Sequence, residues 1–176
     1  MLNFPQIEEY PDYYQPYIEK TRNKDVIKML SENMNELSDA LKNFSDKDAL
    51  FAYDEGKWTI KQLLGHLIDA ELILSNRALR FARLDKTDIP QYDHDDYVKT
   101  GEFNEIPLAD LIDQLFYIRK ANILLFKNLS NNALLYEGTS GGKTFTARSL
   151  IYIIAGHHQH HLEVLKEKYL PRIKKI

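Results

Sequence analysis

Four long segments of this chain repeat their apolar residues every three or four positions, which is the period of an amphipathic helix. We predict helices over residues of about 24–43, 58–84, 107–129 and 146–169. No segment alternates apolar and polar residues in the way that a half-buried strand does. The chain is therefore predicted to be all-α. Its 176 residues are enough to bury a core, and we predict a single domain over 1–176.

Short sequence signals mark the beginnings of these helices. Thr59 is followed three residues later by Gln62, which is the capping-box pattern of a helix N-terminus. Pro107 is well suited to the first turn of the third helix. Before the first helix, several tyrosines and two prolines lie within residues 10–17. We expect an extra helical turn there that packs on the bundle, with a tyrosine-lined ligand pocket as the alternative.

The connection between the second and third helices, residues 85–106, is long. Antiparallel neighbours in a bundle need only about 2–8 connecting residues. A connection of this length can run along the bundle, so that the second and third helices point the same way, or it can be a functional loop over one end. Its acidic residues do not fit a calcium-binding EF-hand, and we expect a solvated loop that includes His94. Tyr92 or an aspartate of this loop could still border a site.

The run from Glu137 to Thr144 has the Gly-Lys-Thr ending of a phosphate-binding loop. That motif needs a glycine where Glu137 stands and a strand before it, and neither condition is met. We therefore predict a turn that leads into the fourth helix.

Composition excludes several functional classes. The chain has no cysteine, so disulfides, thiolate metal sites and a cysteine nucleophile are excluded. A net charge of −3 gives no electrostatic surface for nucleic acid. The N-terminus lacks the pattern of a signal peptide, and no run of about 18 apolar residues is present to span a membrane. We expect a cytoplasmic protein with no membrane or nucleic-acid partner.

Two histidines of the fourth predicted helix, His157 and His161, are four residues apart, so both imidazoles lie on one helix face. They extend a stripe that is otherwise apolar, formed by Leu150, Ile154 and Leu165. Buried polar groups without partners are costly, and a shared metal ion is the simplest partner for two rings. In this register His158 and His160 flank the site or face solvent.

His66, early in the second predicted helix, is the candidate third ligand. A lone histidine is also compatible with an ordinary core or surface residue, and that alternative stays open. Three histidines from two helices that meet across a core match the way helical bundles build metal sites. Three protein ligands leave coordination positions for water or substrate, as in catalytic sites. The metal is a divalent ion such as Zn, Ni, Fe, Co or Mn, and the ligands do not choose between them.

These segments together resemble one known family. The run Trp58-Thr-Ile-Lys-Gln-Leu-Leu-Gly-His66-Leu-Ile-Asp-Ala-Glu71 is similar to the second-helix pattern of the DinB-like (damage-inducible) superfamily. The run Ile151-Tyr-Ile-Ile-Ala-Gly-His157-His158-Gln-His160-His161-Leu162 resembles its fourth-helix pattern, and Pro90 to Val98 is similar to a loop of one branch. The resemblance covers nearly the whole chain.

The resemblance implies a four-helix bundle with up-down-down-up topology and a divalent metal held by His66, His157 and His161. It also implies a metal-dependent enzyme, either an S-transferase that uses a low-molecular-weight thiol or a hydrolase, acting on a small-molecule substrate. The resemblance also implies a homodimer. The alternative is a non-catalytic bundle that binds a metal or a ligand. A fourth protein ligand would favour that alternative, and an open coordination face would favour the enzyme.

Overall fold

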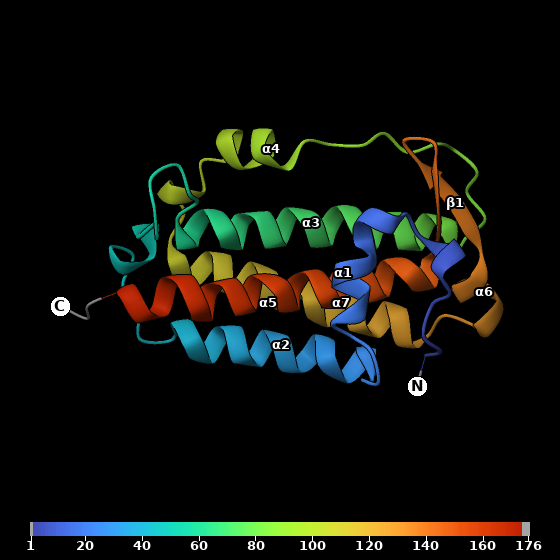
Figure 1. The fold of residues 1–176 in the computed structure, drawn as a ribbon, viewed down its shortest axis with the longest axis horizontal. Coiled ribbons are helices and arrows are strands. Elements are labelled where there is room, and N and C mark those ends of the chain that lie inside the picture. The colour runs from blue at the N-terminus through green and yellow to red at the C-terminus, as the bar shows by residue number, and fades with distance from the viewer. Residues whose placement is uncertain (1, 174–176) are drawn as a thin grey trace.

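The computed structural model describes residues 2–173, and four long helices dominate it (Figure 1). These helices are α2 (Val26–Leu41), α3 (Ile60–Phe81), α5 (Leu108–Lys127) and α7 (Ala147–Val164). Each lies within one of the four segments predicted from apolar periodicity. The predicted all-α bundle is therefore confirmed, with a short β-hairpin added to it.

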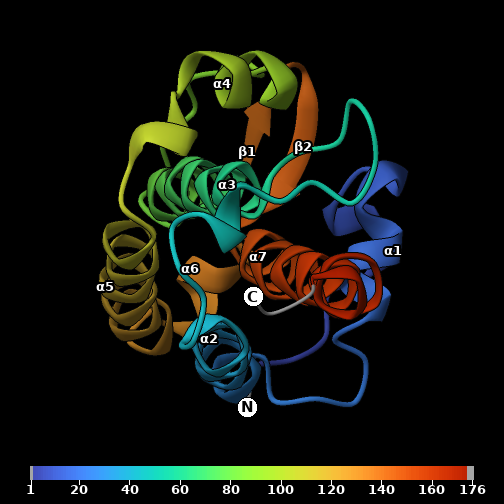
Figure 2. The same cartoon turned by 90° about the vertical axis from the view of Figure 1, so that its left-hand side faces the viewer.

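The four helices form a bundle with up-down-down-up topology, as the resemblance implied. Helix α3 packs on α5 and α7, and α2 packs on the same two helices from the other side (Figure 2). Helices α3 and α5 run in the same direction, because the long connection between them returns along the outside of the bundle and carries α4 (His94–Thr100) (Figure 1). The interpretation of residues 85–106 as a connection that runs along the bundle is confirmed.

Both helices that carry the candidate histidines begin at capping boxes. Thr59 Oγ1 accepts a hydrogen bond from the Gln62 backbone N–H at 3.1 Å, and Gln62 Oε1 accepts one from the Thr59 N–H at 2.9 Å. Thr146 and Ser149 make the same reciprocal pair at the start of α7. These caps satisfy backbone donors that a helix leaves unpaired at its start. They therefore define where each helix begins, and so which of its residues share a face with the histidines.

Short elements cover the bundle. They are 3₁₀ turns at Ile7–Glu9, Asp12–Tyr14, Asp48–Leu50, Phe103–Glu105 and Leu170–Arg172, helices α1 (Gln15–Glu19) and α6 (Asn131–Leu135), and a π-helical turn at Leu165–Tyr169 that continues α7. The predicted helical turn among the tyrosines is α1, which packs against α7. A Cβ on Gly156 of α7 would lie 1.9 Å from the carbonyl oxygen of Tyr17, so a glycine is required for α1 to approach this closely.

The segment predicted as a simple turn before the fourth helix is a β-hairpin, in which β1 (Glu137–Ser140) pairs antiparallel with β2 (Lys143–Thr146). The two residues between the strands, Gly141 and Gly142, have φ of +57° and +71°. Positive φ at both positions is required in a type I′ hairpin turn, and glycine adopts it without strain. Strands of four residues are too short to show an alternating pattern, which is why the sequence did not reveal them.

The first half of helix α7 is deeply buried. Every residue from Ser149 to Gly156 is buried, because α7 is covered by α2, α3 and also α1. Nonpolar side chains from all four long helices fill the interior on both sides of the histidines. None of the helices in residues 2–173 has both the length and the apolar character needed to cross a bilayer.

Candidate metal centre

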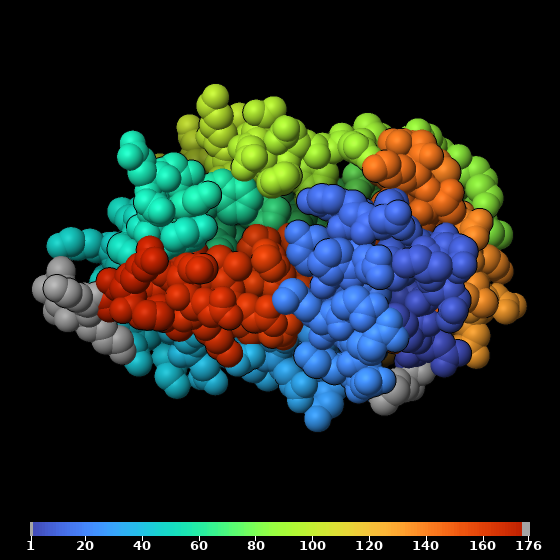
Figure 3. Space-filling view, viewed as in Figure 1, coloured from blue at the N-terminus to red at the C-terminus, as the bar shows by residue number. Residues whose placement is uncertain are grey.

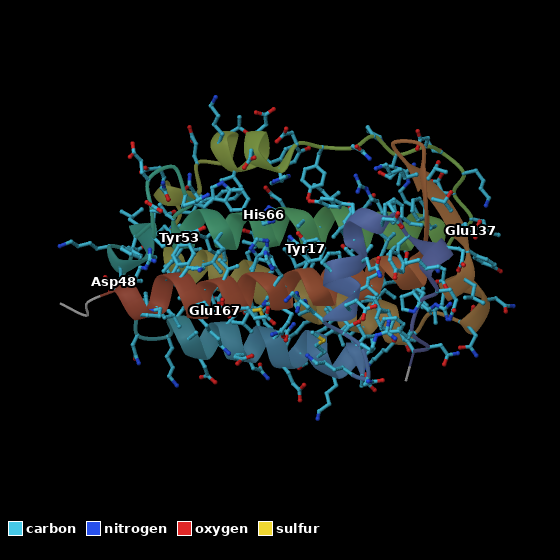
Figure 4. All side chains as sticks on the ribbon, viewed as in Figure 1. Tyr17, Asp48, Tyr53, His66, Glu137 and Glu167 are labelled. Carbon is cyan, nitrogen blue, oxygen red and sulfur yellow. The ribbon has the colours of Figure 1, made fainter. Side chains whose placement is uncertain are left out.

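The three predicted histidines come together between α3 and α7. His66 Nε2 lies 3.0 Å from His157 Nε2, and His161 Nε2 lies 3.1 Å from His157 Nε2. One nitrogen from each ring lies within 4.8 Å of the other two. His157 and His161 are one turn apart on α7, and His66 faces them from α3, near the middle of the bundle's length (Figure 4). The cluster thus joins residues that are 91 positions apart in the sequence.

This donor set fits a divalent transition metal. Three ring nitrogens that point at one another repel unless a proton or a cation lies between them. Imidazole nitrogens bind zinc at about 2.0–2.1 Å, which places two nitrogens on the same ion about 3–3.4 Å apart. The two short separations lie within this range. Imidazole ligands suit zinc, copper, iron and nickel, and they do not select among them.

The rings are buried in a way that keeps them neutral. Burial, and after it the neighbouring imidazoles of His94 and His160, lowers the pKa of His66 to about 4. Burial also holds the pKa of His157 and His161 well below its usual value, with the charge of the other rings acting in the same direction. A neutral imidazole has a free lone pair at neutral pH, which is the form that binds a metal.

Aromatic side chains hold the histidine rings in place. The Trp58 ring stacks on His161 with centroids 6.5 Å apart, and its centroid lies 4.8 Å from that of His66. Tyr17 of α1 packs edge-on against His157 at 5.4 Å. Burial raises the pKa of Tyr17 to about 12, with nearby Tyr13 adding to the shift, so its hydroxyl stays protonated and can donate a hydrogen bond.

The other histidines differ in part from expectation. His158 was predicted to flank the site or face solvent, but it lies in the core, where its Nδ1 accepts a hydrogen bond from Arg119 Nη2 at 2.9 Å. His160 does flank the site, and its ring lies 5.5 Å from that of Tyr17. His94 is half exposed, as a solvated loop residue would be, yet its ring centroid is only 5.7 Å from that of His66.

A cavity of about 370 Å³ opens directly onto the histidine cluster. Its wall includes Tyr14 and Tyr17 from the N-terminal segment and Tyr92 from the long connection. Tyrosines of this segment therefore line a cavity as well as packing on the bundle, and a ligand in that cavity stays a prediction. The suggestion that Tyr92 borders the site is also confirmed. The space-filling view shows a hollow between the α4 segment and α1, and α3 is visible at the floor of that hollow (Figure 3).

The cluster has an open side. Among residues 2–173, no aspartate, glutamate or further histidine joins the three rings as a fourth ligand. Because the cavity lies against the rings, a small molecule can reach the nitrogens from that side. Sequence reasoning missed the polar residues at the other end of this cavity, among them Arg77. The available signal was its position eleven residues after His66, three turns along the same face of α3.

Comparison with known proteins agrees with this arrangement. A sequence profile of the DinB superfamily matches residues 29–165, which include most of α2, all of α3, α5 and α7, and the three histidines. The chain belongs to the DinB superfamily. The predicted resemblance is thereby confirmed.

One protein of similar sequence and one solved structure of similar fold carry similar names. A protein of Oceanobacillus iheyensis named a "putative metal-dependent hydrolase" is 26% identical over 143 residues, which cover 80% of this chain and 81% of that protein. The solved structure of YfiT from Bacillus subtilis, described as a probable metal-dependent hydrolase with an unusual four-helix bundle topology, superposes with a TM-score of 0.72. That match covers 94% of this chain and 92% of YfiT at 17% identity, so it supports the fold.

Proposed function

We propose that this protein is a metal-dependent hydrolase in which His66, His157 and His161 hold a divalent ion and the adjoining cavity holds a small-molecule substrate. One observation carries the proposal: three imidazole nitrogens converge at the wall of a cavity, and no further histidine, aspartate or glutamate of residues 2–173 joins them. A structural metal is usually enclosed by four protein ligands, whereas a catalytic one keeps a position open. The names of the two relatives support the same class.

When bound, such an ion supplies Lewis-acid chemistry: it activates water and polarises the substrate bond that water attacks. The protein's own residues do the remaining work. Trp58 and Tyr17 fix the orientation of the ligand rings, and the aromatic wall excludes bulk water from the reacting groups. His94, half exposed and beside His66, is placed to carry a proton from its imidazole nitrogen to solvent or to a leaving group.

A second candidate is thiol transfer, which the resemblance implies. The chain has no cysteine, so any thiol nucleophile would come from a second small molecule. A cavity of about 370 Å³ that opens on the histidines leaves space for such a reactant. The two candidates use the same three histidines and differ in the nucleophile.

The test is an assay of small esters and amides with protein reconstituted separately with Zn, Ni, Fe, Co and Mn. Each substrate is offered in water alone and with an added low-molecular-weight thiol. The hydrolase proposal predicts turnover in water that requires the metal and is lost in His157→Ala. The matched control is His160→Ala, which removes a ring from the same helix and should retain most of the activity.

The outcomes separate the candidates. Turnover that needs the thiol and transfers sulfur to the substrate would overturn hydrolysis in favour of thiol transfer. Metal binding with no turnover in either arm, across all five metals, would support a non-catalytic binding protein. A homodimer stays a prediction, and sedimentation of the metal-loaded protein checks it.

A further inference from the structure

The cavity continues away from the histidines along α3. His66, Ala70, Leu74 and Arg77 line it from one face of that helix. Eleven residues separate the first and the last of these, which corresponds to about 16 Å along the helix axis. Helix side chains tilt toward the N-terminus, so Arg77 reaches back toward the histidines. A molecule that contacts both ends of the cavity is therefore elongated.

Arg77 is a buried cation that forms no ion pair with any carboxylate of residues 2–173. The residue is almost inaccessible to solvent, at 4% exposure. One guanidinium nitrogen, Nη2, donates to the carbonyl oxygen of Pro90 at 3.0 Å, and the group lies 5.8 Å from the centre of the Tyr92 ring. Its Nε is buried with no hydrogen-bond partner. Within the described chain no carboxylate lies within ion-pair distance of Arg77.

This arrangement is costly unless a ligand completes it. A buried charge is stabilised by a counter-ion and by satisfied hydrogen bonds, and Arg77 has only a carbonyl and an aromatic ring. The hydrogen bond to Pro90 satisfies one nitrogen of the guanidinium, Nη2, and anchors the start of the long connection. It leaves the charge of the guanidinium uncompensated. An anionic group on a ligand would supply what is missing.

A second unpaired polar group lies on the same cavity. Ser140, the last residue of β1, is 1% exposed, and its Oγ has no hydrogen-bond partner. The hairpin is held beside the long connection by two backbone hydrogen bonds, from Ile89 N to Thr139 O at 3.0 Å and from Gly141 N to Ile89 O at 2.9 Å. These bonds bring Ser140 next to the segment whose Pro90 carbonyl binds Arg77.

The charge of the cavity has one sign. Lys143 of β2 lines it together with Arg77, and no aspartate or glutamate of residues 2–173 does. The rings of Tyr14, Tyr92 and Phe145 also line the cavity. The cavity thus combines cationic side chains, aromatic rings and the three-histidine cluster.

We infer that Arg77 and Ser140 form a subsite for an anionic oxygen group, a carboxylate or a phosphate ester, at the far end of an elongated small molecule whose other end lies at the three histidines. Arg77 Nε and Ser140 Oγ donate hydrogen bonds to the anion, and Lys143 adds charge at the entrance. The aromatic rings hold the apolar body of the molecule. The inference rests on the proposed function only for what happens at the histidine end.

The test measures binding rather than turnover. The probes are 4-phenylbutanoate, 2-phenylethyl phosphate and the uncharged 4-phenylbutanamide. Calorimetry is carried out with metal-loaded protein and again after metal removal by a chelator. We expect at least one of the two acids to bind about tenfold or more tightly than the amide in both preparations, since a charge-assisted hydrogen bond is lost in the amide. The acid that binds more tightly shows which anion, carboxylate or phosphate, the subsite prefers.

Variants locate the anion. Arg77→Gln should abolish the preference for the acid, and Ser140→Ala should reduce it by about threefold, as expected for one lost hydrogen bond. Arg83→Gln is the matched control, because it removes an exposed arginine just beyond the same helix and outside the cavity. It should bind the acids as the wild type does. If Arg77→Gln does not fold, the acid–amide comparison and Ser140→Ala still decide the question.

Three results would overturn the inference. The first is equal binding of acids and amide. The second is an acid preference that survives both Arg77→Gln and Ser140→Ala. The third is a preference that appears only with metal and ignores Arg77, because the anion would then lie on the ion, which leaves the proposed function intact. Conversely, an Arg77-dependent preference in a protein that hydrolyses nothing would support this subsite and contradict the hydrolase.

Discussion

Arg119 and Glu71 form a buried bidentate ion pair behind the histidine cluster. Arg119 Nε and Nη2 donate to the two carboxylate oxygens of Glu71 at 2.7 and 2.6 Å, and both side chains are only 2% exposed. Arg119 of α5 also donates to the Leu30 carbonyl of α2 and to His158 of α7, while Glu71 belongs to α3. One side chain therefore links all four long helices.

We predict that Glu71→Gln lowers the free energy of unfolding by about 3–5 kcal/mol, because it leaves the buried guanidinium of Arg119 without a counter-ion. Urea denaturation followed by circular dichroism measures this loss. Replacing both partners with methionine should cost less than the sum of the single changes, since no charge is then left buried. The exposed pair Lys28–Glu32 is the control: Glu32→Gln should change the free energy by less than about 0.5 kcal/mol. A loss below 1 kcal/mol for Glu71→Gln would contradict this role.

Gly156 sets how closely α1 approaches α7. Gly156→Ala would place a Cβ 1.9 Å from the Tyr17 carbonyl oxygen and 2.5 Å from its carbonyl carbon, both backbone atoms. Helix propensity alone favours alanine by up to about 1 kcal/mol. Overpacking against backbone costs about 1–3 kcal/mol, so we expect net destabilisation in thermal unfolding and displacement of Tyr17 from His157.

Gly65 provides the comparison. A Cβ there would lie 2.2 Å from the ring of Phe103, which is a side chain on the long connection. A ring can shift more readily than two packed helix backbones, so Gly65→Ala should destabilise the protein less than Gly156→Ala. The same thermal unfolding experiment checks the order, and the reverse order would show that α1 yields more easily than Phe103 does.

Glu9 gives the stability a pH dependence. Burial acts to raise the pKa of Glu9, but hydrogen bonds from Arg148, the Gln6 N–H and Thr146 outweigh it, so the pKa is lowered from 4.5. A lowered folded pKa stabilises the protein above the unfolded value, and this contribution is lost as the pH falls through the folded value. Glu9→Gln should therefore cost about 1.5–3 kcal/mol at pH 7 and progressively less below about pH 4.5.

Urea denaturation at several pH values checks this dependence. The exposed pair Glu19–Arg22 is the control, and Glu19→Gln should have little effect at any of them. A difference between wild type and Glu9→Gln that stays constant from pH 7 to pH 3 would rule out the ionised Glu9 as its source.

The sequence predicts the parts of this protein that depend on a periodic pattern or a fixed spacing along the chain. Helical periodicity over some twenty residues placed all four long helices, and the capping pair Thr59–Gln62 identified the N-cap of α3, which begins two residues after the predicted start at 58. The pairing of His66 with His157 and His161 followed from facing helix stripes and from the family pattern. Each of these signals is carried by many residues or by a fixed spacing.

The parts that were missed depend on contacts between segments. His158 was placed outside the core because a single stripe was assumed on α7, whereas α1, α2 and α3 cover that helix on several sides. Its partner Arg119 is 39 positions away, and no local pattern marks it. The hairpin depends on two glycines and four residue pairs, and the cavity role of Arg77 depends on that hairpin.

The most direct test of the account is the metal content of protein purified without a histidine tag, measured by elemental analysis alongside His66→Ala, His157→Ala, His161→Ala and the control His160→Ala. We predict about one divalent ion per chain in the wild type and in the control, and loss of most of that metal in each of the three other variants. Full metal content in any of those three variants, or loss in His160→Ala alone, would contradict the three-histidine centre.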